Sequence, residues 1–384
     1  MRWGKWLIVF SFPVLFTGCS HLTKVSASLP SPTIVPKSKD QLKLESKLRQ
    51  LDDYLCRMEK VAGMGKMKVR VYPIRNRSAV ASLNNLNPSP VITNVLVNDF
   101  GCSIEVLTSN VDMLGTAQQL GTFVKKVGEN YGIDGDIVAI NTGMKNGAKS
   151  NNYELSSASF TKPDSKTFIN ITGGGTSSFS VSKVSVVLRM VNPTTQQIEA
   201  SKEGTIYFYG TSADKEFAFF INGIGVGMMR DISLKQSIDE ATARIVKFTL
   251  LKLLGTIGGL PYWNIIGDKF VTEAEKDRVR VQWVSMVKWM ANNGQIDSFI
   301  EKLLKYCYGV KAVKLDKKLD KSETMAIANI LKGLPDSPIV KRVPLSQKER
   351  WAVDLLEYLG ANLHKLRLQR AKKGVTKRAT SRST

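Results

Sequence analysis

Hydrophobic and polar positions alternate with two different periods between residues 66 and 267. Met67–Tyr72 alternates apolar and polar residues, which predicts a β-strand, and apolar runs at 136–141 and 184–191 predict two more. Apolar residues recur at helical spacing over 237–254, which predicts a long helix with one buried face. Strands that alternate with helices indicate a small α/β (α+β) domain over 66–267.

Two further stretches, 144–183 and 204–229, carry a weaker alternation with polar turn residues near their middle, and we expect each to form a β-hairpin. Each arm has about ten residues, the length that a tilted transmembrane strand needs. Unpaired backbone groups in lipid cost several kcal/mol each, so such hairpins would have to pair with those of neighbouring copies in a ring. The alternative is two extended hairpins packed on a soluble domain. The side chains that we assign to the membrane hairpins are Tyr153, Phe168, Ile206, Phe208, Phe217 and Phe219.

The N-terminal residues have the order of a lipoprotein signal peptide. A short basic start precedes an apolar run of about eleven residues, Trp6–Phe16, which is too short to span a bilayer. Thr17 and Gly18 then place small residues before Cys19, whose thiol can carry a diacylglycerol. We therefore expect a signal peptide over 1–18 and a lipidated, palmitate-bearing Cys19. The alternative is an ordinary cleaved signal with a chance cysteine.

The remaining segments flank the predicted domain. Residues 19–65 are predicted to form a tether rich in Pro, Ser and Lys, followed by an amphipathic helix. Residues 268–366 are predicted to form amphipathic helices with a basic outer face, and 367–384 a basic tail. Two roles for the helical extension stay open, packing on the ring or docking another envelope complex.

Charge and cysteine content narrow the class of protein. The chain carries a net charge of +22, yet an exported lipoprotein rarely meets nucleic acid, so we expect the basic tail to touch anionic lipid or cell-wall polymer. Beyond Cys19, three cysteines permit one disulfide at most, and we expect Cys56, Cys102 and Cys307 to be buried or free thiols.

No pattern in the sequence indicates an enzyme. The two histidines, His21 and His364, fall in the tether and near the tail, so neither a Ser-His-Asp triad nor a histidine-rich metal site is expected. The glycines at 173–175 and around 225 lack the Lys-Ser/Thr of a phosphate-binding loop. We expect no catalytic residues, no metal and no cofactor.

The most specific block is the strand and turn at 184–195, VSVVLRMVNPTT, which resembles the "V-x-L-R-hydrophobic-V-(N/D)-x-x-T-G" motif of the curli secretion-channel lipoproteins (CsgG-type) and the related holdfast-anchor lipoproteins. Gln196 stands where that family usually has glycine. Residues 66–74 resemble the family's opening strand, and 237–264 its last helix and closing motif. The resemblance covers 66–267.

The resemblance implies a ring-shaped homo-oligomer in the outer membrane. In that family two β-hairpins per subunit build one barrel, a domain faces the periplasm, and a loop after the first strand narrows the pore. Here the loop is 75–87, and no aromatic residue stands at the equivalent of the family's narrowing positions. The pore-constriction residues implied in this chain are Leu83, Asn84, Asn85 and Leu86.

The leading hypothesis is an outer-membrane secretion channel for an unfolded or extended polymer, curli-like or another surface polymer. The alternative is a structural outer-membrane lipoprotein of a conjugation, pilus or type IV secretion-like assembly without an open pore. A periplasmic binding module that uses its basic tail is a third. The implied partners are other copies of the chain, outer-membrane lipid, and the secreted polymer or envelope assembly proteins.

A Cys19→Ser change should abolish lipidation, because it removes the thiol that accepts the lipid. The chain should then leave the detergent phase in phase partitioning and migrate differently in electrophoresis. Ser20→Ala, which keeps the thiol, serves as the control and should behave like the parent chain. Unchanged partitioning and mobility of the Cys19→Ser chain would contradict the assignment.

Overall fold

The computed structural model describes residues 43–63, 65–78, 86–107, 130–148, 178–193, 195–211, 217–222, 224–229 and 232–362. The chain divides into two compact units. The first, called here the sheet unit, comprises Met1–Glu45, Val69–Val95 and Leu107–Leu250. The second, the helical unit, comprises Ser46–Lys68, Leu96–Val106 and Leu251–Thr384.

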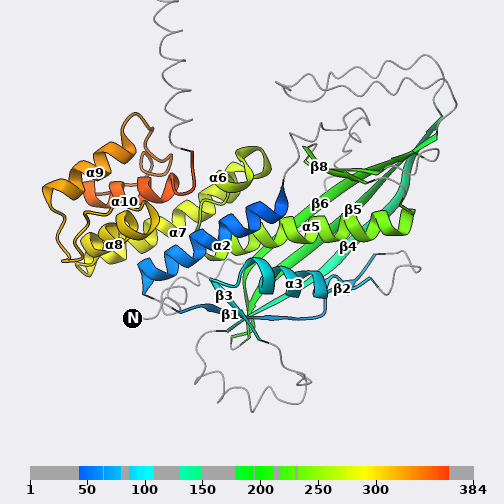
Figure 1. Cartoon of the computed structure of the whole chain (residues 1–384), viewed down its shortest axis with the longest axis horizontal. Helices are drawn as coiled ribbons and strands as arrows, with labels where there is room; N and C mark the ends of the chain where they lie inside the picture. Colours follow the sequence, from blue (N-terminus) through cyan, green and yellow to red (C-terminus); the bar gives the residue numbers. More distant parts are fainter. Residues whose placement is uncertain are drawn as a thin grey trace, which may run out of the picture. The chain divides into compact units, whose positions relative to one another are not determined.

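The described strands form one sheet in the order β3-β1-β4-β5-β6-β7-β8 (Figure 1). Neighbours from β4 to β8 are antiparallel, and the short strand β2 pairs in parallel with β4. The strands are β1 (Met67–Val71), β2 (Arg75–Asn76), β3 (Ile104–Val106), β4 (Asn130–Ala148), β5 (Ser178–Asn192), β6 (Gln197–Thr211), β7 (Phe217–Ile221) and β8 (Ile224–Met229).

The described helices range in length from four residues in α6 to 24 residues in α5. None of them is long and apolar enough to cross a membrane. They are α2 (Leu44–Ala62), α3 (Ser89–Asp99), α5 (Leu234–Ile257), α6 (Trp263–Ile266), α7 (Glu273–Asn292), α8 (Ile296–Lys302), α9 (Lys321–Leu331) and α10 (Gln347–Glu357). A 3-10 turn, η3 (Asp268–Phe270), follows α6, and a π-helical segment, η4 (Leu303–Cys307), continues α8.

Strand β5 is the middle strand of the sheet, and the alternation of apolar and polar residues along it places one row of apolar side chains in the core. Val184, Val186, Leu188 and Met190 point to one face and are fully buried, each contributing about 1.5–3 kcal/mol through the burial of apolar surface. The turn into β6 has Gln196 in the left-handed region, with φ of 57°. The mixed α and β composition, the strands at 136–141 and 184–191 and the turn after 191 are therefore confirmed.

Helix α5 packs on the sheet through a position that only glycine can occupy. A Cβ atom at Gly204 of β6 would lie 2.2 Å from the Thr249 Oγ1 and 2.8 Å from the Ile245 Cδ1. The absence of a side chain at this point lets the helix approach the strand closely. The helix predicted over 237–254 is confirmed and extends further at both ends.

The second predicted hairpin, 204–229, is wrong in one respect, because its second arm is not a single strand of about ten residues. The arm is divided into β7, with five residues, and β8, with six. Ile221 pairs with Ile224 across a two-residue turn, and Asn222 has φ of 50°. Asn222-Gly223 is the preferred dipeptide for such a turn, so the sequence held the signal for it.

Only the base of the first predicted hairpin, 144–183, belongs to the described residues. There β4 and β5 remain paired as far as Ala148 and Ser178. Tyr153, Phe168 and the rest of 149–177 lie outside the described residues, as do Cys19 and the tail 367–384.

The helical unit confirms that the C-terminal region is helical through α7, α8, α9 and α10. Its core centres on Trp283, Tyr262 and Trp263, and the Trp263 and Trp283 rings lie 5.8 Å apart. Capping boxes fix where three of its helices begin: Thr272 with Glu275, Asp320 with Glu323, and Ser346 with Glu349.

A disulfide within the helical unit corrects one expectation. Cys56 of α2 is bonded to Cys102, which follows α3, so the expected thiols at these two positions are wrong. Cys307 is a free, buried thiol, as expected. Sequence reasoning missed the bond because spacing alone does not reveal which cysteines meet. Disulfides persist in oxidising compartments, which fits an exported chain.

Breaking this bond should destabilise the helical unit. It closes a loop with a sequence separation of 46 residues, and removing it should lower the free energy of unfolding by about 4 kcal/mol in the chain-entropy account. The measurement is urea unfolding of the parent and of a Cys56→Ser/Cys102→Ser chain, with and without reductant. Reductant should affect only the parent; equal midpoints in all four samples would contradict the prediction.

Candidate functional site: an anchored loop, a buried hairpin and the Arg280 network

The loop predicted to narrow a pore, 75–87, begins on strand β2. Arg75 and Asn76 pair with Asp136 and Ile137 of β4, and the Arg77 backbone N–H donates to the Ile137 carbonyl at 2.9 Å. These backbone bonds fix the first end of the loop to the sheet.

Charges strengthen this attachment. The Asp136 carboxylate is 3% exposed; its oxygens lie 2.8 Å from the Arg77 Nε and 2.7 Å from the Arg189 Nη2. Arg189 also donates to Asp134 at 2.8 Å, and this hydrogen bond is the main reason that the pKa of Arg189 is raised. A buried carboxylate held by two guanidinium groups is costly to leave unpaired.

The Ser89 hydroxyl fixes the other end of the loop, where α3 begins. It accepts a hydrogen bond from the Ile74 N–H at 2.9 Å and donates to the Tyr72 carbonyl at 3.1 Å. The Asn87 side chain accepts from the Ser89 N–H at 3.0 Å. Both ends of the loop are therefore held close to one another within the sheet unit.

Of the four implied constriction residues, the structure describes one. Leu86 is half-buried next to the Ser89 attachment point. Leu83, Asn84 and Asn85 lie outside the described residues, so their place in a constriction stays a prediction.

The structure brings together the aromatic residues predicted for the second membrane hairpin, but in the interior of the sheet unit. Phe208 and Phe219 are at most 1% exposed, and Ile206 and Phe217 are also buried. The Phe208 ring lies 5.9 Å from Phe219 and 6.3 Å from Phe217, and the Arg244 guanidinium of α5 lies 5.3 Å from the Phe219 ring centre.

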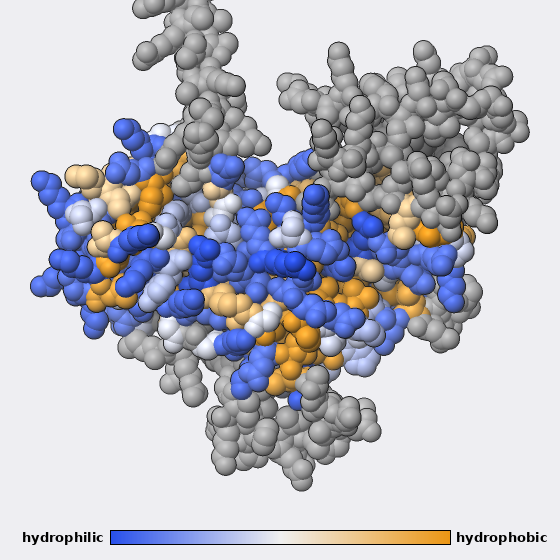
Figure 2. Space-filling model, viewed as in Figure 1, coloured by the Kyte–Doolittle hydropathy of each residue, from blue (hydrophilic) through white to orange (hydrophobic). Residues whose placement is uncertain are grey.

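In the single chain these four side chains are therefore covered within the sheet unit, and Phe219 contacts α5 through Arg244. This burial favours the alternative of a hairpin packed on the domain, because it removes large apolar side chains from solvent within the same molecule. Their place in the wall of an oligomeric barrel stays a prediction. The face of the molecule in Figure 2 is mostly hydrophilic in its described part.

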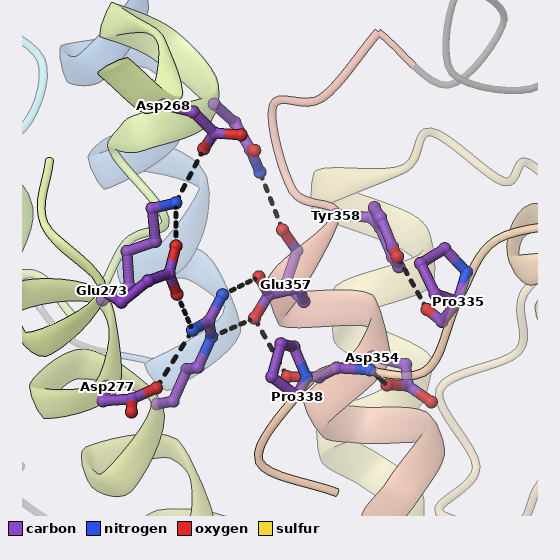
Figure 3. A network of polar contacts seen from close by, with 12 residues as sticks. Asp268, Glu273, Asp277, Pro335, Pro338, Asp354, Glu357 and Tyr358 are labelled. Carbon is purple, nitrogen blue, oxygen red and sulfur yellow. Dashed lines mark hydrogen bonds and ion pairs between the residues drawn. The ribbon is translucent and has the colours of Figure 1, made fainter. Parts of the chain in front are cut away.

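A network of charges in the helical unit centres on Arg280 of α7, and Figure 3 shows its partners Glu273, Asp277 and Glu357. Its guanidinium forms two hydrogen bonds with the Glu357 carboxylate of α10, at 2.9 and 2.7 Å. It also bonds to Glu273 at 3.1 Å and Asp277 at 3.0 Å, and lies 5.4 Å from the Trp263 ring centre. One buried side chain thus holds two helices together.

Further pairs extend the network. Lys276 bonds to Glu273 at 2.6 Å, and Arg342 donates twice to Asp277, at 2.9 and 2.8 Å. The hydrogen bonds from Arg342, and after them the bond from Arg280, hold the pKa of Asp277 at about 2. Burial instead raises the pKa of Asp354 to about 6, although its carboxylate accepts the Ser337 N–H at 2.7 Å.

The Arg280 network is suited to holding helices rather than to catalysis, since its carboxylates are engaged by cations or backbone N–H groups. Among the described residues, no group of three His, Cys, Asp or Glu side chains is placed to hold a metal ion. Sequence reasoning missed the network because it assigned charged positions to solvent. The signal was the spacing of Glu273, Asp277 and Arg280 on one face of α7.

Comparisons with known proteins assign no family. No protein-family model and no curated protein match the chain. Lipoprotein GNA1162 from Neisseria meningitidis is 12% identical, with a TM-score of 0.20 over 38% of this chain and 84% of that one. The LpoB C-terminal domain from Salmonella enterica is 13% identical, with a TM-score of 0.21 over 42% of this chain and 97% of that one. The function therefore has to be argued from this chain's own residues.

The raised pKa of Asp354 predicts a pH dependence of stability. The folded state binds a proton more tightly than the unfolded state, whose carboxyl has a pKa of 3.8. Stability should therefore fall as pH rises from about 4 to about 6, by at most about 3 kcal/mol. Asp354→Asn keeps the oxygen that accepts the Ser337 N–H, and it should reduce the fall of the unfolding free energy with pH. Urea unfolding of the parent and of the Asp354→Asn chain at pH 4, 5, 6 and 7 measures this dependence. The same dependence on pH in the two chains would refute the prediction.

Proposed function

We propose that this protein is a lipid-anchored structural subunit of an assembly in the bacterial outer membrane, with its main domain facing the periplasm and without an open pore of its own. The observation that carries the proposal is the position of the second hairpin. Its apolar side chains form part of the core of the sheet unit, and its second arm turns back at Asn222.

The short length of β7 and β8 supports this reading over a barrel wall. A transmembrane strand needs about nine to eleven residues, whereas β7 has five and β8 has six. All five side chains of β7 are buried. A hairpin whose apolar residues are already covered has little to gain from lipid, so it supports a packed domain.

Two independent features support an exported, anchored chain. The residues before Cys19 have the order of a lipoprotein signal, and Cys56 and Cys102 form a disulfide of the kind that oxidising compartments maintain. Outer-membrane lipid is then the first partner, reached through Cys19. No catalytic activity is part of the proposal.

An edge strand supports assembly with other chains. Among the described strands, β8 has a neighbour on one side only. Its sequence, Ile224–Met229, contains no charge and no proline, the residues that usually protect such an edge from pairing. Strand addition by a second copy or by an envelope assembly protein is the contact that this edge fits.

The second candidate is the secretion channel for an unfolded or extended polymer. The length of β4 and β5, 19 and 15 residues, favours it because each exceeds the length of a transmembrane strand. In that case the hairpin between them would enter the membrane in a homo-oligomeric ring, and Leu83, Asn84, Asn85 and Leu86 would line the constriction.

Membrane fractionation, electron microscopy and planar-bilayer conductance of detergent-extracted particles separate the two candidates. The structural subunit should fractionate with outer membranes, form particles larger than one chain, and leave bilayer conductance at the level of the detergent blank. Ring-shaped particles with discrete conductance steps would rule out the structural subunit and support the secretion channel. A monomer absent from outer membranes would overturn both, and the Cys19→Ser chain provides the unanchored control.

A further inference from the structure

A lysine-rich loop joins η4 to α9 in the helical unit. We call residues 311–321 the lysine loop. All five of its lysines are exposed, and within the described residues none of them forms an ion pair. They are Lys311, Lys314, Lys317, Lys318 and Lys321.

Two buried carboxylates accept hydrogen bonds from the backbone of this loop. The Lys314 N–H donates to the Glu323 Oε1 at 3.0 Å, and the Lys317 N–H donates to the Glu301 Oε2 at 3.1 Å. Glu301 is 0% exposed and Glu323 is 2% exposed. Burying a carboxylate is costly, and burial raises the pKa of Glu301. Glu301 and Glu323 therefore fix the backbone of this loop, and Glu323 also caps the start of α9.

The loop also contains a strained residue. Lys317 has φ of 66°, in the left-handed region that residues with a Cβ rarely adopt. The bond to Glu301 and the bond from the Lys318 N–H to the Asp316 carboxylate, at 3.1 Å, hold the chain in this conformation. The lysines are consequently presented from a fixed backbone. The loop's two carboxylates, Asp316 and Asp320, accept the N–H groups of Lys318 and Glu323, and the five lysines outnumber them.

An exposed leucine lies among the lysines. Leu315 is 43% exposed between Lys314 and Lys317. Exposed lysines on both sides of an exposed apolar residue in the sequence match the boundary of an anionic bilayer, where phosphates accept the lysines and the leucine enters the acyl region. The loop contains no aromatic residue and no arginine, the side chains that stack on bases or bind phosphates in pairs. This composition favours lipid over nucleic acid.

We propose that the lysine loop docks on an anionic phospholipid surface through Lys314, Lys317, Lys318 and Leu315. The proposal rests on the proposed function in that it requires the chain to work beside a membrane. It gives the helical unit a second membrane contact, independent of Cys19.

To test the docking, an environment-sensitive dye is attached to the thiol that Leu315→Cys introduces into the full chain. The chain also carries Cys19→Ser, which removes the acyl anchor. The disulfide and the burial of Cys307 leave the new thiol as the reactive one. Vesicles contain phosphatidylglycerol in phosphatidylcholine, or phosphatidylcholine alone. A dye on Met325→Cys, on the exposed face of α9, serves as the matched position control.

The emission of the dye at position 315 should shift to shorter wavelengths on the phosphatidylglycerol vesicles only. About 0.5 M salt should reverse this shift, because it screens the attraction between the lysines and the lipid phosphates. Replacing Lys314, Lys317 and Lys318 by Gln should weaken the response on the order of 100-fold, at roughly fivefold per lysine. The same change at Lys235, Lys332 and Lys341, exposed lysines outside the loop, should leave it unchanged.

Three results would overturn the proposal: equal emission on both kinds of vesicle, an equal shift for the dye at Met325→Cys, or a response to the control lysines as large as to the loop lysines. An equal response to an oligonucleotide with the same phosphate concentration would assign the loop to phosphate in general. Because the assay uses the unanchored chain, its failure leaves the outer-membrane fractionation of the proposed function unaffected.

Discussion

The close approach of helix α5 to strand β6 is the constraint on which the sheet unit depends. Gly204 provides the space, because any side chain there would collide with Thr249 and Ile245. With the helix this close, the Arg244 guanidinium lies over the Phe219 ring. Phe208 and Phe217 are buried beside Phe219, so the second hairpin belongs to the core of the sheet unit in the single chain.

The helical unit is held by covalent and ionic links rather than by apolar packing alone. The Cys56–Cys102 disulfide ties α2 to the segment after α3, and Arg280 joins α7 to α10 through Glu357. A buried ion pair gives little net stability but penalises any arrangement that leaves one partner unpaired. Such links suit a rigid adaptor that presents fixed surfaces, the lysine loop among them.

Periodicity predicted the parts of the fold that follow from local chemistry. The alternation over 184–191, the turn near Gln196 and the spacing along α5 correspond to observed elements. It could not predict which face of the second hairpin is covered, because an apolar strand suits lipid and a protein core equally well. It also missed the Cys56–Cys102 bond and the role of Arg280, since both depend on residues far apart in sequence.

A double-mutant cycle between Arg244 and Phe219 tests whether the second hairpin packs under α5 in the native protein. Arg244→Met, Phe219→Leu and the double variant are unfolded in urea after extraction from membranes. We expect a coupling free energy of about 0.5–2 kcal/mol between the two side chains. Effects that add to within about 0.3 kcal/mol would mean that the hairpin lies elsewhere in the native protein.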